Sequence, residues 1–150
     1  MTLISNTYGL GLSFRGERWH PEPMFLRPLD PVADRLEPLG INRAAAERLS
    51  QGGTLLDIAA GTTLCRLGDR GLEAFLLLEG TANVLTNDGV IAIGPGEVVG
   101  ELATLDPGRS RNATVVAATD MTVLVFDART FRGLARVDDL RDRLAPARAA

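Results

Sequence analysis

The spacing of apolar residues divides the chain into a helical part, a part of short strands and a second helical part. Over residues 31–51, apolar side chains recur three or four positions apart. Pro31 suits the first turn of one helix and Gly40 its end, while Asn42 suits the N-cap of a second helix that Gly52 would stop. We therefore expect short helices in this range.

From Thr54 onward the period of the pattern shortens. Short apolar runs alternate with turn residues, and the expected strands cover residues 54–59, 63–67, 74–78, 81–86, 90–93, 98–99, 113–118 and 121–126. The sequence Asn87-Asp88-Gly89 is a strong hairpin signal. Short strands at this spacing predict a mainly β fold, a jelly-roll barrel over residues 54–127 that is flanked by short N- and C-terminal helices.

Two further helices are expected over residues 128–145. Asp127 suits the N-cap of the first, and Val137, Leu140 and Leu144 form one apolar stripe on the second. A helix of about two turns is marginal alone, so this stripe must pack against a surface. Docking on the chain's own barrel is one interpretation, and the seam of a homodimer is the other.

The first 30 residues differ from the rest of the chain. They contain its only Trp, Tyr and His, among several Gly and Pro, and they sustain neither a helical nor a strand period. This composition predicts an irregular N-terminal arm over residues 1–30, followed by a single domain over residues 31–150. The arm could pack on its own domain, on a second subunit or on another protein.

Composition narrows the function classes. A chain of 150 residues has room for one domain with a real core. Its net charge is −3 and all 16 basic residues are Arg, so we expect no direct binding to nucleic acid, which usually needs a basic face. No recognition helix follows the last expected helix. No apolar run approaches the ~20 residues that span a membrane, and we expect a cytoplasmic protein.

One run of residues carries most of the candidate chemistry. Gly96-Glu97-Val98-Val99-Gly100-Glu101-Leu102-Ala103 is followed by Arg111-Asn112-Ala113-Thr114-Val115. Glycine lets the backbone approach a ligand closely, and free N–H groups at a helix start favour an anion. An arginine fork fits a phosphate, and Glu101 is an acceptor for sugar hydroxyls. Together these parts predict a site for a sugar joined to a phosphate.

This run resembles the phosphate-binding cassette of the cyclic nucleotide-binding domain family. That family includes the sensor domains of catabolite activator protein, of the protein kinase A regulatory subunit and of cyclic nucleotide-gated channels. The resemblance extends backward through the ordered glycines Gly61, Gly68, Gly80 and Gly89, and covers residues from about 55 to about 130. It implies the jelly-roll fold together with cyclic AMP or cyclic GMP as the ligand, without a metal.

The resemblance also implies a role for each residue of the cassette. Glu101 would accept a hydrogen bond from the ribose 2′-hydroxyl, and Arg111 would pair with the phosphate. The backbone N–H groups of Leu102 and Ala103 would complete the anion site, and Gly100 would let the chain approach the ligand. Two residues after the arginine complete the expected ligand-binding set, Asn112 and Ala113. Asn112 stands where family members carry Ala, Ser or Thr, and its type does not settle adenine against guanine.

The function that follows is a non-catalytic sensing module that relays to an effector protein through its terminal helices. Catalysis is not expected, because the single histidine, His20, lies in the arm and leaves the barrel without a His-based metal site or a His base. Cys65 is expected to be a small buried residue. The alternative is an interaction module that keeps the fold and binds no nucleotide.

Overall fold

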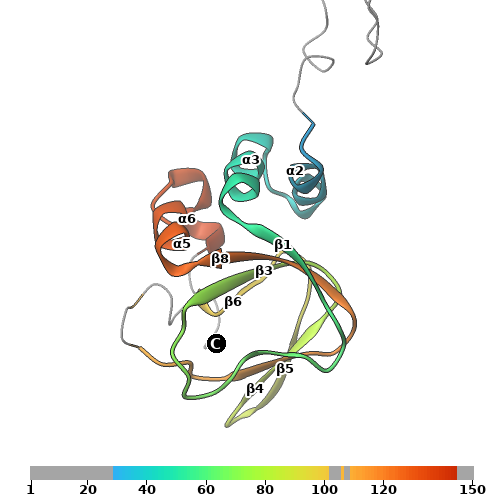
Figure 1. The fold of residues 1–150 in the computed structure, drawn as a ribbon, viewed down its shortest axis with the longest axis vertical. Helices are drawn as coiled ribbons and strands as arrows, with labels where there is room; N and C mark the ends of the chain where they lie inside the picture. The colour runs from blue at the N-terminus through green and yellow to red at the C-terminus, as the bar shows by residue number, and fades with distance from the viewer. Residues whose placement is uncertain (1–28, 102–105, 107–108, 145–150) are drawn as a thin grey trace, which may run out of the picture.

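The computed structural model describes residues 29–101, 106 and 109–144, so most of the predicted arm over residues 1–30 lies outside the described residues (Figure 1). In chain order its helices and strands are α2 (Pro31–Leu36), η1 (Glu37–Leu39), α3 (Arg43–Gly52), β1 (Thr54–Ile58), β2 (Thr63–Cys65), β3 (Glu73–Glu79), β4 (Ala82–Thr86), β5 (Gly89–Ile93), β6 (Val98–Val99), β7 (Thr114–Ala117), β8 (Met121–Asp127), α5 (Ala128–Leu134) and α6 (Asp138–Leu144). Every strand expected from the sequence is present.

The strands form two antiparallel four-stranded sheets. Their orders are β1-β8-β3-β6 and β2-β7-β4-β5, so the chain crosses between the sheets several times. The predicted hairpin joins β4 to β5, where Gly89 takes a φ of +135° that favours glycine. This mainly β arrangement with short flanking helices confirms the predicted jelly-roll fold class.

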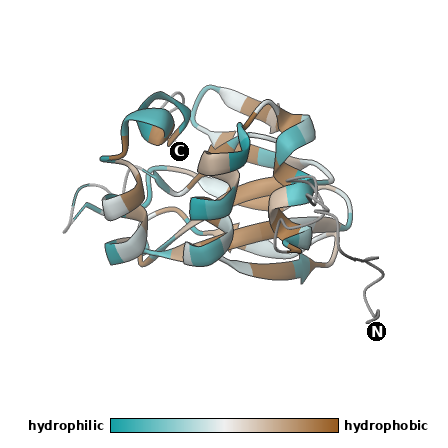
Figure 2. Ribbon diagram, turned by 90° about the horizontal axis from the view of Figure 1, so that it is seen from above, coloured by the Kyte–Doolittle hydropathy of each residue, from teal (hydrophilic) through white to brown (hydrophobic). Residues whose placement is uncertain are grey.

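The two central strands of the β1-β8-β3-β6 sheet, β8 and β3, are buried on both faces, whereas the edge strand β1 is largely exposed. Along β3, Ala74, Leu76 and Leu78 face the helices, whereas Phe75 and Leu77 face the second sheet. This alternation follows from the two-residue period of a strand, and it explains why β3 reads as one continuous apolar run. Figure 2 shows these hydrophobic strands beneath the helices. The fold therefore has two apolar clusters, one on each side of this sheet.

The N-terminal helices begin at side-chain caps. Asp30 accepts a hydrogen bond from the Ala33 amide at 2.9 Å, and Asn42, as predicted, accepts one from the Ala45 amide at 2.9 Å. The last turn of the first helix is a 3₁₀ turn, η1, because Pro38 supplies no N–H for an α-helical bond. Gly40 ends η1 in the left-handed conformation, as its position in the sequence indicates.

The C-terminal helices pack on the same sheet. Asp127, as predicted, caps α5 by accepting from the Thr130 amide at 2.8 Å, and the helix ends at Leu134. Leu140 and Leu144 on α6 are fully buried in the cluster that α2 and α3 cover. The stripe therefore docks on its own domain, and these two leucines leave no exposed seam for a second subunit. None of the helices described is long and apolar enough to cross a membrane.

Candidate functional site

Arg111 is anchored through its main chain just before β7. Its amide donates to the Asp69 carbonyl at 2.7 Å, and its carbonyl accepts from the Gly68 amide at 2.9 Å. Both bonds tie it to the turn that follows β2. Only 7% of Arg111 is exposed, so it is not a solvated surface arginine.

The guanidinium of Arg111 is held by two backbone carbonyls. Nη1 donates to the Gly100 carbonyl at 2.9 Å, and Nη2 donates to the Glu73 carbonyl at 2.8 Å. The arginine thus joins the start of β3 to the loop that follows β6. A guanidinium has more N–H donors than these two bonds use, so it can also donate to an anion.

Gly100 makes this arrangement sterically feasible. Its φ is +82°, and a Cβ added there would lie 2.6 Å from Nη1 of Arg111 and 2.9 Å from the Glu73 carbonyl oxygen. Both separations are shorter than any ordinary contact of a side-chain carbon. Glycine at this position is therefore required by the packing of Arg111 as well as by the backbone conformation.

Glu101 follows Gly100 directly and is 2% exposed. Burial of a carboxylate is costly unless polar groups or an opposite charge accompany it, and the Arg111 guanidinium binds the carbonyl of Gly100, the residue directly before Glu101. The structure therefore brings together the acid and the arginine that the sequence pairs. The burial of both residues, with the arginine bound to the backbone beside the acid, is the strongest feature of the candidate site.

The remaining predicted residues divide into two groups. Leu102 and Ala103, whose amides were expected to bind an anion, lie outside the described residues. Ala113 is buried in the cluster between the sheets. Asn112 is half-buried, and its buried Oδ1 accepts no hydrogen bond within the part of the chain that the structure describes. A buried acceptor of this kind is suited to a donor from a ligand.

Cys65 lies near the same charged groups and is 4% exposed, as the sequence indicates for a small buried residue. Burial raises the pKa of its thiol to about 11, while Arg111 lowers it and Glu101 raises it through their charges. The thiol is therefore protonated at neutral pH and unsuited to nucleophilic chemistry. Among the residues described, no group of three or more His, Cys, Asp and Glu could hold a metal.

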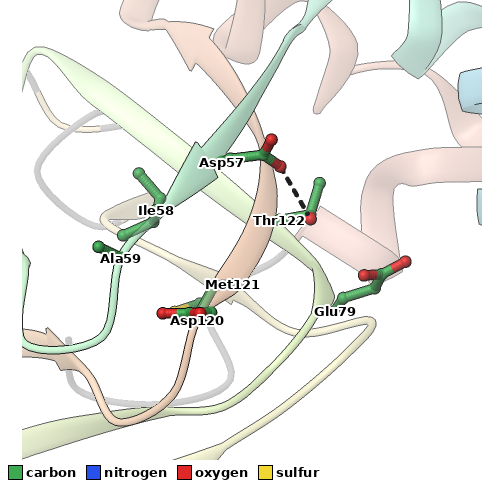
Figure 3. A pocket seen from close by; sticks show the side chains of 7 residues that line it. All are labelled: Asp57, Ile58, Ala59, Glu79, Asp120, Met121 and Thr122. Atoms are coloured by element: carbon green, nitrogen blue, oxygen red, sulfur yellow. Dashed lines mark hydrogen bonds between the residues drawn. The ribbon is translucent and has the colours of Figure 1, made fainter.

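A cavity of about 460 Å³ lies elsewhere in the fold. Its lining consists of Asp57, Ile58, Ala59, Glu79, Asp120, Met121 and Thr122 (Figure 3). Glu79 is the last residue of β3, whereas Arg111 contacts the first, and a strand of this length spans about 20 Å. The cavity is thus separate from the candidate site.

The carboxylates around this cavity form hydrogen bonds and an ion pair that stabilise the fold. Asp57 accepts from the Thr122 hydroxyl at 3.1 Å, Asp120 caps the Ala60 amide at 3.0 Å, and Glu79 pairs with Arg35 of α2. None of these residues belongs to the predicted ligand-binding set. The cavity therefore adds no chemistry to the site at Arg111.

One part of the site carries no signal in the sequence. The Glu73 carbonyl holds Arg111 across 38 positions of the chain, and any residue type would supply the same carbonyl. The Gly68 and Asp69 backbone contacts are of the same kind.

Comparison with known proteins matches residues 55–138 to the cyclic nucleotide-binding domain. The Pycsar effector protein XpPycTIR of Xanthomonas perforans is 41% identical over 81 residues, which are 53% of this chain and 26% of that protein. A cyclic nucleotide-gated potassium channel of Rhizobium etli is 37% identical over 75 residues, or 50% of this chain and 21% of the channel. This chain therefore spans about a quarter or less of these relatives.

A solved structure shares both the fold and part of the sequence. A point mutant of the cAMP-binding acyltransferase from Mycobacterium smegmatis superimposes with a TM-score of 0.59 and 30% identity. The match covers 75% of this chain and 39% of that one. The family match, for its part, runs from β1 to the start of α6 and includes the whole candidate site.

Proposed function

The chain belongs to the cyclic nucleotide-binding domain family, and we propose that it is a non-catalytic sensing module that binds cyclic AMP or cyclic GMP. The observation that supports binding is that Arg111 and Glu101 are both buried and that the Arg111 guanidinium binds the carbonyl of Gly100, the residue before Glu101. A buried arginine beside a buried acid offers one group for a phosphate and one for a sugar hydroxyl. The ligand would need no metal, because the guanidinium offsets the phosphate charge.

Six of the seven predicted residues, all except Gly100, adjoin the ligand in this proposal. Arg111 donates to the cyclic phosphate, and Glu101 accepts from the ribose 2′-hydroxyl. The amides of Leu102 and Ala103 add donors to the phosphate, and Asn112 and Ala113 border the ligand where β7 begins. The base is not assigned, because Asn112 carries both a donor and an acceptor.

Relay to an effector protein would use the C-terminal helices, in the cytoplasm. The Ala128 amide, at the start of α5, donates to the Leu72 carbonyl at 3.0 Å, and Leu72 precedes the Glu73 carbonyl that holds Arg111. The first turn of α5 thus begins beside the strand that contacts the site. Ligand binding would shift the population between two arrangements of these helices, which the partner distinguishes.

Titration calorimetry and thermal denaturation test the proposal. Cyclic AMP or cyclic GMP should raise the melting temperature of the parent chain, and 5′-AMP should raise it less. Arg111→Ala should weaken cyclic nucleotide binding by about 2–5 kcal/mol, because a desolvated phosphate loses its partner. Arg109→Ala is the matched control, since Arg109 is exposed in the same loop and should leave the affinity unchanged.

The second candidate function is an interaction module that binds no nucleotide. One observation favours it: Arg111 bonds to two backbone carbonyls of its own chain, so it can serve the fold alone. Absence of a thermal shift with all three nucleotides would support this candidate and contradict the sensing module. Equal affinities of the parent and the Arg111→Ala variant would instead place the site elsewhere.

A further inference from the structure

We infer that Gly100 and the Glu73 carbonyl form a seat for the Arg111 guanidinium, and that Gly100 contributes to ligand binding through Arg111 rather than by touching the ligand. The seat is defined as the space bounded by the Gly100 backbone and the Glu73 carbonyl oxygen. The inference rests on the proposed function, because it concerns how the arginine of that site is positioned. Gly100 is thus a positioning residue.

The first argument is the distance between Gly100 and the arginine. A Cβ at Gly100 would lie 2.6 Å from Nη1 and 3.3 Å from Cζ of Arg111, so the guanidinium occupies the space that any larger residue needs. The contact is direct and involves the charged group itself. A side chain here would therefore displace the arginine from the bond that it makes to the Gly100 carbonyl.

The second argument comes from the other left-handed glycines. Among the residues described, only Gly100 combines a positive φ with an added Cβ that would meet a charged side chain closer than 3.0 Å. Gly61 has a φ of +90° and nothing within 4 Å of its added Cβ, so its glycine is needed for conformation alone. Gly80 has a φ of +84° and is also sterically required, but its added Cβ would meet the Asp120 carbonyl oxygen at 2.3 Å and no charged group. The clash with a charged side chain is therefore particular to Gly100.

The third argument is that hydrogen bonds within the chain hold the arginine. The Arg111 main chain is bonded to Gly68 and Asp69, and its side chain is bonded to Gly100 and Glu73. Ordering a long side chain usually costs free energy on binding, and this cost is reduced when the side chain is already held. Donors that the two carbonyls leave over can then bind an anion without the side chain first having to be ordered.

The test compares two variants that share backbone strain. Gly100→Ala should weaken binding of cyclic AMP by about thirtyfold or more, as expected when a buried charge pair is disrupted. Gly61→Ala carries the same left-handed strain without the clash, and its affinity should stay within about twofold of the parent. Circular dichroism and thermal denaturation identify any variant that does not fold. Equal affinities of the parent and a folded Gly100→Ala variant would overturn the inference.

Dependence on Arg111 is tested by combining the substitutions. In the Arg111→Ala background, Gly100→Ala should cause no further loss of affinity beyond about twofold, because the residue through which Gly100 acts is gone. A further loss as large as in the parent background would show that Gly100 acts directly on the ligand. If the parent itself binds no cyclic nucleotide, the proposed function fails instead.

Chemical rescue supplies a readout that a purely structural role would not change. Ethylguanidine added to the Arg111→Ala variant should enter the vacated seat and restore part of the affinity for cyclic AMP. It should not rescue the double variant with Gly100→Ala, whose Cβ fills the same space. Rescue of both variants, or of neither, would contradict the seat.

Discussion

Arg143 donates a hydrogen bond from Nη2 to the carbonyl oxygen of Gly40 at 3.1 Å, across 103 positions of the chain. Gly40 ends η1, and Arg143 lies in the last turn of α6. Nη1 of the same arginine lies 3.9 Å from where a Cβ at Gly96 would stand, in the turn before β6. The C-terminal helix therefore meets the N-terminal helices and the turn that leads toward Gly100.

Arg143→Ala should lower the free energy of unfolding by about 0.5–1.5 kcal/mol, because one hydrogen bond between distant elements is lost. Urea denaturation measures this difference. Arg141→Ala is the matched control on the same helix: Arg141 pairs with Asp138, and the side chains are 61% and 87% exposed, so the loss should be about 0–0.5 kcal/mol. The same destabilisation by both substitutions would show that the Gly40 bond contributes nothing specific.

Leu140→Ala should lower the free energy of unfolding by about 2–5 kcal/mol, because it leaves a cavity under α6. Leu140 is fully buried, whereas Leu85 is 40% exposed on β4 and serves as the control. Chemical denaturation should separate the two variants clearly. If Leu140→Ala instead dissociated a dimer in sedimentation experiments and left the monomer equally stable, the stripe would be an intersubunit seam.

Glu101→Gln should weaken the preference of the protein for a ribose over a deoxyribose, because a neutral amide oxygen replaces the charged acceptor. The parent should bind cyclic AMP more tightly than 2′-deoxy-cyclic AMP by about 1.5–3 kcal/mol, the contribution of a hydrogen bond to a charged group. In the variant the two ligands should bind with more similar affinities, as measured by calorimetry. An unchanged preference in the Glu101→Gln variant would assign the sugar contact to another residue.

Cys65 should resist alkylation in the native protein. Burial raises the pKa of its thiol from the ordinary value of 9.0 to about 11, and only the thiolate reacts with iodoacetamide. At pH 8 the labelling rate should rise sharply on addition of urea. Because Cys65 is the single cysteine, the mass added by alkylation reports on this thiol only. Fast labelling without denaturant would contradict burial of the thiol.

The same shift predicts how stability depends on pH. Between pH 9 and pH 11 the unfolded chain loses the thiol proton while the native protein keeps it, so the contribution of Cys65 to stability falls as the pH rises. Cys65→Ala should show a smaller loss of stability over this interval than the parent. Identical pH profiles in urea denaturation would rule out the shift.

The sequence predicted the fold in detail because its local signals agree with the tertiary structure. Gly40, Asn42 and Asp127 each mark a helix boundary by a mechanism that acts within a few residues. A strand with one buried face alternates apolar and polar residues. A strand buried on both faces is instead a continuous apolar run. Asp30, which caps α2, is a further boundary signal that our prediction did not use, although it directly precedes Pro31.

The candidate site was predictable in its residue types and not in its connections. Gly100, Glu101 and Arg111 stand in a recognisable order, and the structure buries the acid and the arginine together. That Arg111 bonds to the Glu73 carbonyl depends on how β3 passes the cassette, which no local pattern encodes. The Arg143 bond to Gly40 likewise depends on the packing of two helical layers.

The β1-β8-β3-β6 sheet lies between the two apolar clusters and contributes side chains to both. In β8, Leu124 and Phe126 belong to the cluster under the helices, while Val123 belongs to the cluster between the sheets. Unfolding of either cluster would expose the apolar face of the strands that it shares with the other cluster. The helices and the jelly roll should therefore unfold in one cooperative transition. A conformational change that reaches the helices should therefore be a rigid-body shift or tilt of the helices on the sheet, since local unfolding would destabilise the whole domain.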